Sequence, residues 1–199
     1  FLSDILKEID CESGKEDAYL NHIAWSPCST KLLSVFHFTE TEREIRKVYP
    51  ILLDLDENSW SIIDSTGLFS HHVWLDNNNI LAYKKIDMKE GFCTWSKSSG
   101  WVAISGSMPT TDGHPSPFND SEAIMVDTYP NLFGKMKLYM GSCKPGTSFN
   151  MVGWFFNPSG YRGPLRCDLH PRVCKDNSKV VCDIPTREGR RIVIMERKC

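Results

Sequence analysis

The chain has 199 residues, and its 23 Lys and Arg against 25 Asp and Glu give a formal net charge of −2. This length allows one medium-sized domain with a buried core, and a composition that is 41% hydrophobic and 24% charged excludes wholesale disorder, collagen and a pure coiled coil. The balanced charge does not indicate a nucleic-acid partner, and no apolar run reaches the roughly 18 residues of a membrane span. We therefore expect the chain to bind neither nucleic acid nor a membrane.

A short amphipathic helix or linker is predicted over residues 1–18. Leu2, Ile5, Leu6 and Ile9 recur there at helical spacing, set among Asp and Lys. Helical pattern is otherwise nearly absent, which indicates an all-β chain.

From residue 20 onward the sequence repeats, and each of four units opens with a histidine. Each unit then has a short strand, a polar turn and a second apolar strand, and we expect third strands over 49–55, 101–105, 137–140 and 191–195. The histidines are His22, His71, His114 and His170, at steps of 49, 43 and 56 residues. These steps are typical of β-propeller blades.

We therefore predict an all-β fold of about four four-stranded antiparallel β-propeller blades, starting near residues 20, 70, 113 and 168 of a single domain that covers residues 1–199. A β-sandwich is the alternative, because short alternating strands suit both folds. Four blades are few for a closed ring, so we expect part of a larger propeller, completed by a missing half or by a second copy. The first residue is Phe1 rather than Met, which indicates a fragment or a processed product.

The eight cysteines form no Cys-x-x-Cys pair and no disulfide framework. We therefore expect reduced cysteines and a cytoplasmic location. Cys28, Cys174 and Cys182 have apolar neighbours and are predicted to be buried thiols.

The recurring histidines predict a metal site. Equivalent positions in successive blades point to a shared axis, and imidazole is a common metal ligand. Asp168 and His170 lie on the same side of one predicted strand, beside Arg166, so Asp168 and His170 could bind a divalent cation together with His114. The alternative is structural, with each histidine supporting a turn of its own blade.

Other residues have weaker signals. His37 and His72 fall outside the repeat register, and we interpret them as surface or supporting residues. Asp127 and Asp183 each follow their histidine by thirteen residues, which predicts that they hold an imidazole or a backbone turn. Trp154, near a long loop, could stack on a sugar.

Three segments resemble the later blades of oligogalacturonate lyases and their uncharacterised relatives. They are residues 22–27 (HIAWSP), 71–77 (HHVWLDN) and 167–171 (CDLHP), and the last is followed by 188–191 (EGRR). The resemblance spans residues 20–197, about half of such a protein. It implies a seven-bladed propeller that cleaves short pectin fragments, which are acidic oligosaccharides, by β-elimination with a divalent metal, foremost Mn²⁺.

Carried over residue by residue, the resemblance implies metal ligation by His114 and His170 and catalytic roles for His71 and Arg46. The family's His-Pro-His-Pro motif is changed, because Asp168 replaces its first histidine and no glutamine matches the one before it. A carboxylate still suits manganese or magnesium.

The resemblance thus implies a substrate site as well, for which the candidates are His22, Arg166 and Trp154. In β-elimination a cation and an arginine offset the charge that develops on the uronate carboxylate. Imidazoles titrate near neutral pH, so His71 could take the proton. The alternatives are a non-catalytic glycan- or protein-binding propeller and an inactive truncated copy.

Overall fold

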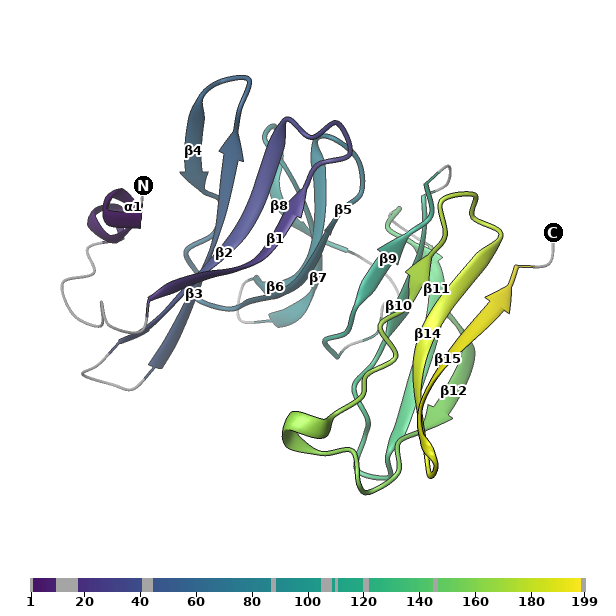
Figure 1. Cartoon of the computed structure of the whole chain (residues 1–199). Coiled ribbons are helices and arrows are strands. Elements are labelled where there is room, and N and C mark those ends of the chain that lie inside the picture. The colour runs from purple at the N-terminus through teal and green to yellow at the C-terminus, as the bar shows by residue number, and fades with distance from the viewer. Residues whose placement is uncertain are drawn as a thin grey trace. The chain divides into compact units, whose positions relative to one another are not determined.

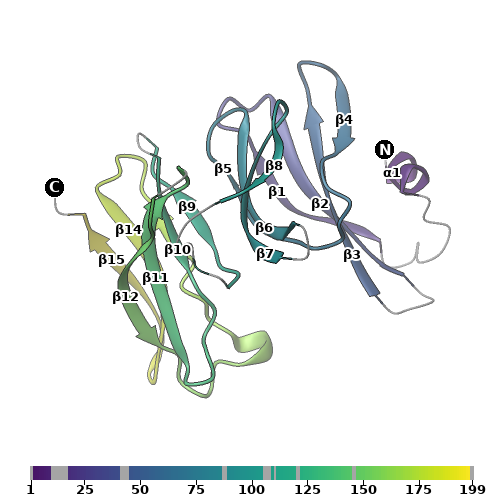
Figure 2. The same cartoon turned by 180° about the vertical axis from the view of Figure 1, so that it is seen from behind.

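The computed structural model describes residues 2–9, 18–40, 45–86, 89–104, 109, 111–119, 122–144 and 147–197. Within these ranges the chain forms one short α-helix, one 3-10 turn and fifteen strands, which make four antiparallel sheets (Figures 1 and 2). Each sheet consists of strands that are consecutive along the chain and pair antiparallel with their neighbours, which is the construction of a propeller blade. The predicted all-β fold of propeller blades is confirmed. The seven-bladed ring and the single domain stay predictions, because the chain divides into two compact units.

The first unit covers Phe1–Phe69 and Asp76–Asn78 and contains the helix and the first sheet. In chain order its elements are α1 (Leu2–Glu8), β1 (Tyr19–Trp25), β2 (Lys31–Glu40), β3 (Ile45–Asp54) and β4 (Ser59–Ile62). Ile5 of the helix is fully buried against Phe36 and Ile51 of the sheet. The predicted helix is therefore confirmed, and the burial of Ile5 explains its apolar spacing.

The second unit covers Ser70–Leu75 and Asn79–Cys199 and contains three further sheets. The second sheet is β5 (Phe69–Trp74), β6 (Asn79–Ile86), β7 (Lys89–Ser96) and β8 (Gly100–Ala103). The third is β9 (Pro115–Pro117), β10 (Ala123–Asp127), β11 (Lys135–Ser142) and β12 (Asn150–Phe156). The fourth is β13 (Arg172–Val173), β14 (Lys179–Thr186) and β15 (Gly189–Glu196), preceded by the 3-10 turn η2 (Gly163–Leu165).

Successive sheets of the second unit pack face to face. Leu81 and Phe92 of the second sheet share one apolar cluster with Ile124 of the third. Met136 of the third sheet shares another with Val180 of the fourth. Burial of these side chains stabilises each interface by about 1.5–3 kcal/mol per residue, which holds the loops between the sheets in fixed positions.

Three details differ from the sequence predictions. Residues 101–105 were expected to form a third strand, but Gly100–Ala103 is the fourth strand of its sheet, because β7 precedes it. In the described residues the fourth sheet has three strands instead of four. Of the three cysteines predicted to be buried, Cys182 is buried, Cys174 is half-buried and Cys28 is exposed in a turn.

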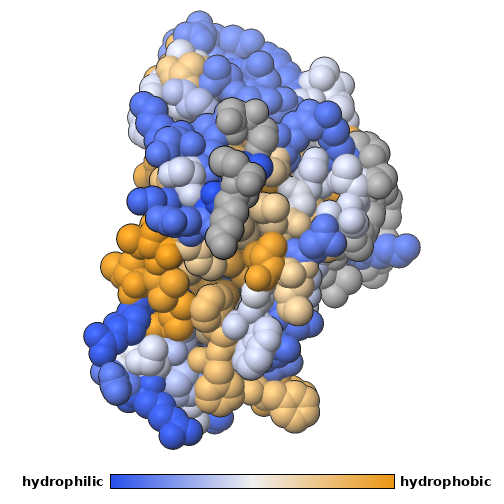
Figure 3. Space-filling model, turned by 90° about the vertical axis from the view of Figure 1, so that its right-hand side faces the viewer, coloured by the Kyte–Doolittle hydropathy of each residue, from blue (hydrophilic) through white to orange (hydrophobic). Residues whose placement is uncertain are grey.

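The outer strands of the second unit expose apolar side chains. Ile192 and Ile194 of β15 are 72% and 60% exposed, and Trp154 and Phe156 of β12 are also exposed. Figure 3, which views the molecule from the side of these strands, shows hydrophobic surface gathered there. No described helix is long and apolar enough to cross a membrane.

Candidate metal and acid–base site

Three of the four repeat histidines meet in the second unit. The ring centroids of His71 and His114 lie 4.1 Å apart, and those of His114 and His170 lie 3.9 Å apart. The three imidazoles come from segments that open the second, third and fourth sheets. The fourth histidine, His22, lies in the first unit.

His114, Asp168 and His170 form a candidate metal site. Each offers one ligand atom, and these atoms all lie within 4.8 Å of one another. Ligand atoms that bind one ion at about 2.0–2.2 Å lie at most about 4.4 Å apart. A shift of a few tenths of an ångström would therefore let all three bind a single ion. These are the three residues that the sequence proposes as ligands.

The carboxylate of Asp168 supports this assignment. Its side chain is buried, and Oδ2 accepts a 2.8 Å hydrogen bond from Nε of Arg166. Its other oxygen, Oδ1, is buried and has no hydrogen-bond partner in the described part of the chain. A buried carboxylate oxygen without a donor is costly unless a cation binds it, so the residues present fit a divalent ion.

Asp127 holds both candidate histidine ligands in place. It is completely buried, and its carboxylate accepts hydrogen bonds from the backbone N–H of His114 (2.6 Å), from Nδ1 of His114 (3.0 Å) and from the backbone N–H of His170 (3.0 Å). Nδ1 of His114 is therefore the protonated nitrogen, which leaves Nε2 to bind a metal. The prediction that Asp127 holds an imidazole is confirmed. Asp183, for which the same role was predicted, is exposed.

The second imidazole is oriented by a backbone group. Nδ1 of His170 donates to the carbonyl oxygen of Asp168 at 3.2 Å, which again leaves Nε2 as the ligand atom. Burial and the neighbouring His114 lower the pKa of His170, so the ring favours its neutral, metal-binding form. Burial opposes the ionisation of Asp127, but the hydrogen bonds from His114 and His170 outweigh it and keep the pKa of Asp127 below its usual value.

The backbone around the site is tightly constrained. A Cβ atom on Gly113 would lie 1.9 Å from the carbonyl oxygen of Asp127, so only glycine fits before His114. His170 has a φ of 42°, in the left-handed region that non-glycine residues rarely adopt. Such strained residues cluster at functional sites, where surrounding contacts hold them.

His71 lies beside the candidate ligands and is hydrogen-bonded through one ring nitrogen to a carboxylate. Its Nδ1 lies 3.1 Å from Oδ1 of Asp112, whose Oδ2 accepts a hydrogen bond from the Ser70 hydroxyl. A carboxylate only accepts, so Nδ1 carries the proton and Nε2 is the basic nitrogen. The hydroxyl of Tyr129 lies 3.3 Å from Nε2 and can donate to it.

Arg166 and Tyr129 lie side by side at this site. The guanidinium carbon of Arg166 lies 4.4 Å from the centre of the Tyr129 ring. The Arg166 side chain is 49% exposed, so its remaining N–H groups can reach a ligand. Burial raises the pKa of Tyr129 to about 12, which keeps its hydroxyl protonated.

The remaining sequence candidates lie elsewhere. Arg46 and His22 are in the first unit, where both lie beside His37. Trp154 is on β12, at the opposite edge of the third sheet from β9, and Nζ of Lys135 lies 4.4 Å from its ring centre. The structure thus does not bring Trp154 to the histidine cluster.

Sequence reasoning missed three residues. Asp112 and Tyr129 lie in loops, and loop side chains follow no periodicity that indicates their direction. His37 was interpreted as a surface or a supporting residue, and its buried side chain contradicts the first of these and leaves the second as a prediction. The one feature of the sequence that could have indicated Asp112 is its position two residues before the repeat histidine His114.

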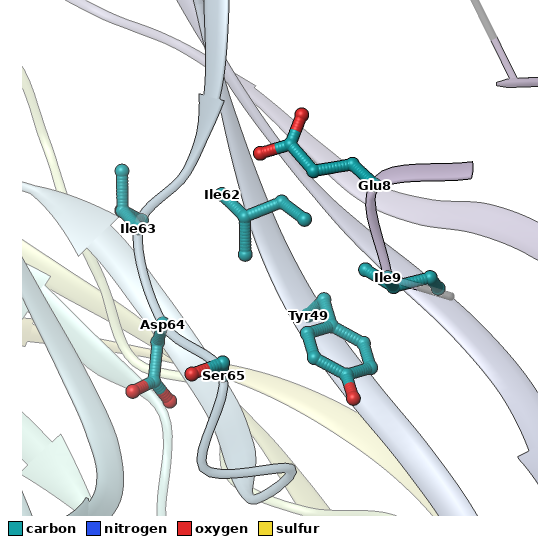
Figure 4. A pocket seen from close by; sticks show the side chains of 7 residues that line it. All are labelled: Glu8, Ile9, Tyr49, Ile62, Ile63, Asp64 and Ser65. Atoms are coloured by element: carbon teal, nitrogen blue, oxygen red, sulfur yellow. The ribbon is translucent and has the colours of Figure 1, made fainter. Parts of the chain in front are cut away.

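The first unit also contains a pocket of about 570 Å³ beside α1 (Figure 4). Its wall combines three isoleucines and a tyrosine with polar side chains: Glu8, Ile9, Tyr49, Ile62, Ile63, Asp64 and Ser65. It includes none of the predicted site residues.

Comparison with known proteins identifies the fold. No family model and no curated protein matches the chain. Among solved structures, TolB from Acinetobacter baumannii superposes with a TM-score of 0.60 at 13% identity, covering 90% of this chain and 41% of that one. The putative TolB from Agrobacterium tumefaciens gives 0.60 at 12% identity, covering 90% and 58%. An acylaminoacyl peptidase from Pyrococcus horikoshii gives 0.63 at 10% identity, covering 94% and 33%.

Identities this low show a shared fold and nothing more. The chain spans less than two thirds of the length of each of these proteins. The chain therefore has the β-propeller fold of TolB-like proteins and of peptidase propeller domains.

Proposed function

We propose that the chain is part of a metal-assisted carbohydrate-active enzyme that cleaves acidic uronate oligosaccharides by β-elimination. One observation carries the proposal: His114, Asp168 and His170 present their ligand atoms within 4.8 Å of one another, and one buried oxygen of Asp168 lacks a partner in the described residues. Two imidazole nitrogens and a carboxylate oxygen form a donor set that suits Mn²⁺. When bound there, the ion would neutralise the uronate carboxylate and acidify the adjacent C–H bond.

The chain's own residues supply the remaining chemistry. Arg166 binds the uronate carboxylate through the N–H groups that Asp168 leaves free. His71 takes the proton from C5 on its Nε2, and Asp112 stabilises the imidazolium that forms. The bond from C4 to the leaving oxygen then breaks, the C4–C5 double bond forms, and the leaving oxygen takes a proton from water.

The other sequence candidates enter the proposal as sugar contacts. Arg46, for which the resemblance implies a catalytic role, would bind an acidic sugar group at the first unit together with His22, and Trp154 would stack on a sugar ring. A cytoplasmic location is part of the same proposal and rests on the absence of a disulfide framework in the sequence.

A non-catalytic glycan-binding propeller is the second candidate. The exposed aromatic rings favour it, because Trp154 is 53% exposed and Phe133 is 84% exposed on the third sheet and its connecting turn. Aromatic rings of this kind bind sugars without any metal chemistry.

The test is an elimination assay with short oligogalacturonides and Mn²⁺, followed by the ultraviolet absorbance of the unsaturated product. We expect His71→Gln to lower the rate by at least about 100-fold, because a general base contributes that much, and to leave the bound metal unchanged. His72→Gln is the matched control, since His72 is the adjacent imidazole on the opposite face of β5.

Metal-loaded protein that leaves every uronide intact would remove the lyase proposal. If oligogalacturonides then bind and Trp154→Ala weakens their binding, the glycan-binding candidate takes its place.

A further inference from the structure

The first unit contains a second polar cluster, formed by side chains of β1, β2 and β3. The ring of His37 stacks on the ring of Tyr19, with centroids 5.0 Å apart and planes 16° from parallel. Arg46 donates from one guanidinium nitrogen to the hydroxyl of Tyr19 and to Nδ1 of His37, the latter at 3.1 Å. The strand register explains this arrangement, since Tyr19 pairs with His37 and Arg46 pairs with Thr39, two residues along from His37.

These contacts fix the protonation of His37. A guanidinium only donates, so Nδ1 of His37 accepts and its proton lies on Nε2. Burial, together with the positive charges of Arg46 and His22, lowers the pKa of His37 to about 4 and keeps the ring neutral. Its Nε2–H is buried and has no acceptor in the described residues. A native structure seldom leaves such a donor unused unless something binds it.

The charges in the cluster favour a negative ligand. Among the described residues, no carboxylate pairs with Arg46, and the charged groups that act on His37 are both basic. Arg46 keeps further N–H donors in the planar fork that matches carboxylate and phosphate groups. Arg46 and Nε2–H of His37 therefore both offer hydrogen-bond donors to a ligand.

His22 gives a further reason to regard this cluster as a binding site. Its ring centroid lies 6.3 Å from that of His37, and its φ is 51°. The residue sits where the register of β1 against β2 shifts, between Asn21 and Ala24. Bulges of this kind redirect a side chain and are frequent beside functional sites. Both His22 and Arg46 are exposed, so a ligand can approach them from solvent.

We infer that Tyr19, His37 and Arg46, with His22 beside them, form a binding site for the oxyanion of an acidic sugar. The ligand group is the carboxylate of a sugar acid or the phosphate of a sugar phosphate, bound by the Arg46 fork and by Nε2–H of His37. The site works without the metal cluster of the second unit. It rests on the proposed function only for the class of ligand, an acidic sugar, and its test does not depend on lyase activity.

The experiment titrates the protein, in EDTA, with three sugars that differ only at C6: galacturonate, galactose 6-phosphate and galactose. Binding is followed by calorimetry and by the imidazole ¹⁵N signals of histidine-labelled protein. We expect an acidic sugar to bind saturably and to shift the His37 signal, while galactose does neither. Tighter binding of galacturonate identifies the carboxylate as the ligand group, and tighter binding of galactose 6-phosphate identifies the phosphate.

Two variants locate the binding. Arg46→Gln and His37→Phe, which keeps the ring packed on Tyr19, should each weaken binding by roughly tenfold or more, because each removes a donor to a charged group. Arg191→Gln, on an exposed arginine of the second unit, is the matched charge control and should bind like the wild type.

The inference fails if neither acidic sugar binds, or if Arg46→Gln binds as tightly as the wild type. If His37→Phe does not fold, the binding measured for Arg46→Gln decides the test, because Arg46 is exposed and its replacement should not disturb folding. Because these titrations contain no metal, a negative result contradicts the oxyanion site without bearing on the proposed metal site. A negative result at the metal site likewise does not bear on the oxyanion site.

Discussion

The substitution Asp168→Asn tests whether Asp168 is a metal ligand or a carboxylate with a structural role only. In the metal-free protein, the unpartnered buried oxygen of Asp168 costs about 1–3 kcal/mol. The ion pair with Arg166, whose side chain is 49% exposed, contributes only about 0–1 kcal/mol. Asp168→Asn removes the buried charge and the ion pair, and a neutral amide costs less to bury than a carboxylate, so the metal-free variant should be at least as stable as the wild type, with a melting temperature equal or higher by about 2–4 °C.

With metal the order reverses. At a free Mn²⁺ concentration of about 100 times Kd, the wild type should gain about 2.7 kcal/mol, or about 5–10 °C in melting temperature. Asp168→Asn should lose most of this gain because a neutral amide is a poor metal ligand. Differential scanning calorimetry with EDTA and with Mn²⁺ gives all four values. A variant that melts well below the wild type in EDTA, together with no effect of Mn²⁺ on either protein, would refute the reasoning.

Three further predictions follow from the same contacts. Asp127→Asn keeps one oxygen that can accept from His114 but turns an NH2 group toward the backbone N–H of His170, so two buried donors face each other. Urea denaturation should therefore show a loss of about 1–3 kcal/mol in the free energy of unfolding, and Mn²⁺ titration should show about 10–100-fold weaker binding. Gly113→Ala places a Cβ against the backbone of Asp127, so it should weaken Mn²⁺ binding although no ligand is changed; wild-type affinity would contradict this close approach of the two backbones. His37 has a folded pKa of about 4, below the value of about 6.5 for an unfolded histidine, so the unfolded state takes up more protons between these values. The free energy of unfolding should therefore fall by up to about 3 kcal/mol as the pH falls from 6.5 to 4, and His37→Phe should remove that part of the loss; an unchanged pH dependence would assign the loss to other groups.

The sequence was most informative where a repeat constrained it. Spacing alone placed His114, Asp168 and His170 in one site, because equivalent positions of successive blades face the same side. It also indicated that Asp127 supports an imidazole. The register of the strands depends on which alternate side chains are buried, and the alternation of apolar and polar residues in the sequence shows this directly.

The parts that could not be predicted depend on contacts between strands and on loops. His37 is buried because β1 pairs with β2 in a register that places Tyr19 opposite it, and no local pattern encodes that pairing. Asp112 and Tyr129 approach His71 from connecting segments, whose direction is set by the packing of neighbouring sheets. The third strand of the second sheet was missed because β7 contains few β-branched residues, while the Trp101 segment after it resembles a strand more strongly.

The metal content of the purified protein tests the central claim most directly. The wild type, loaded with Mn²⁺ and desalted, should retain about one ion per chain by elemental analysis, and the His114→Ala/His170→Ala double variant should retain none. Equal metal content in the two proteins, or a wild type that keeps no metal, would contradict the account.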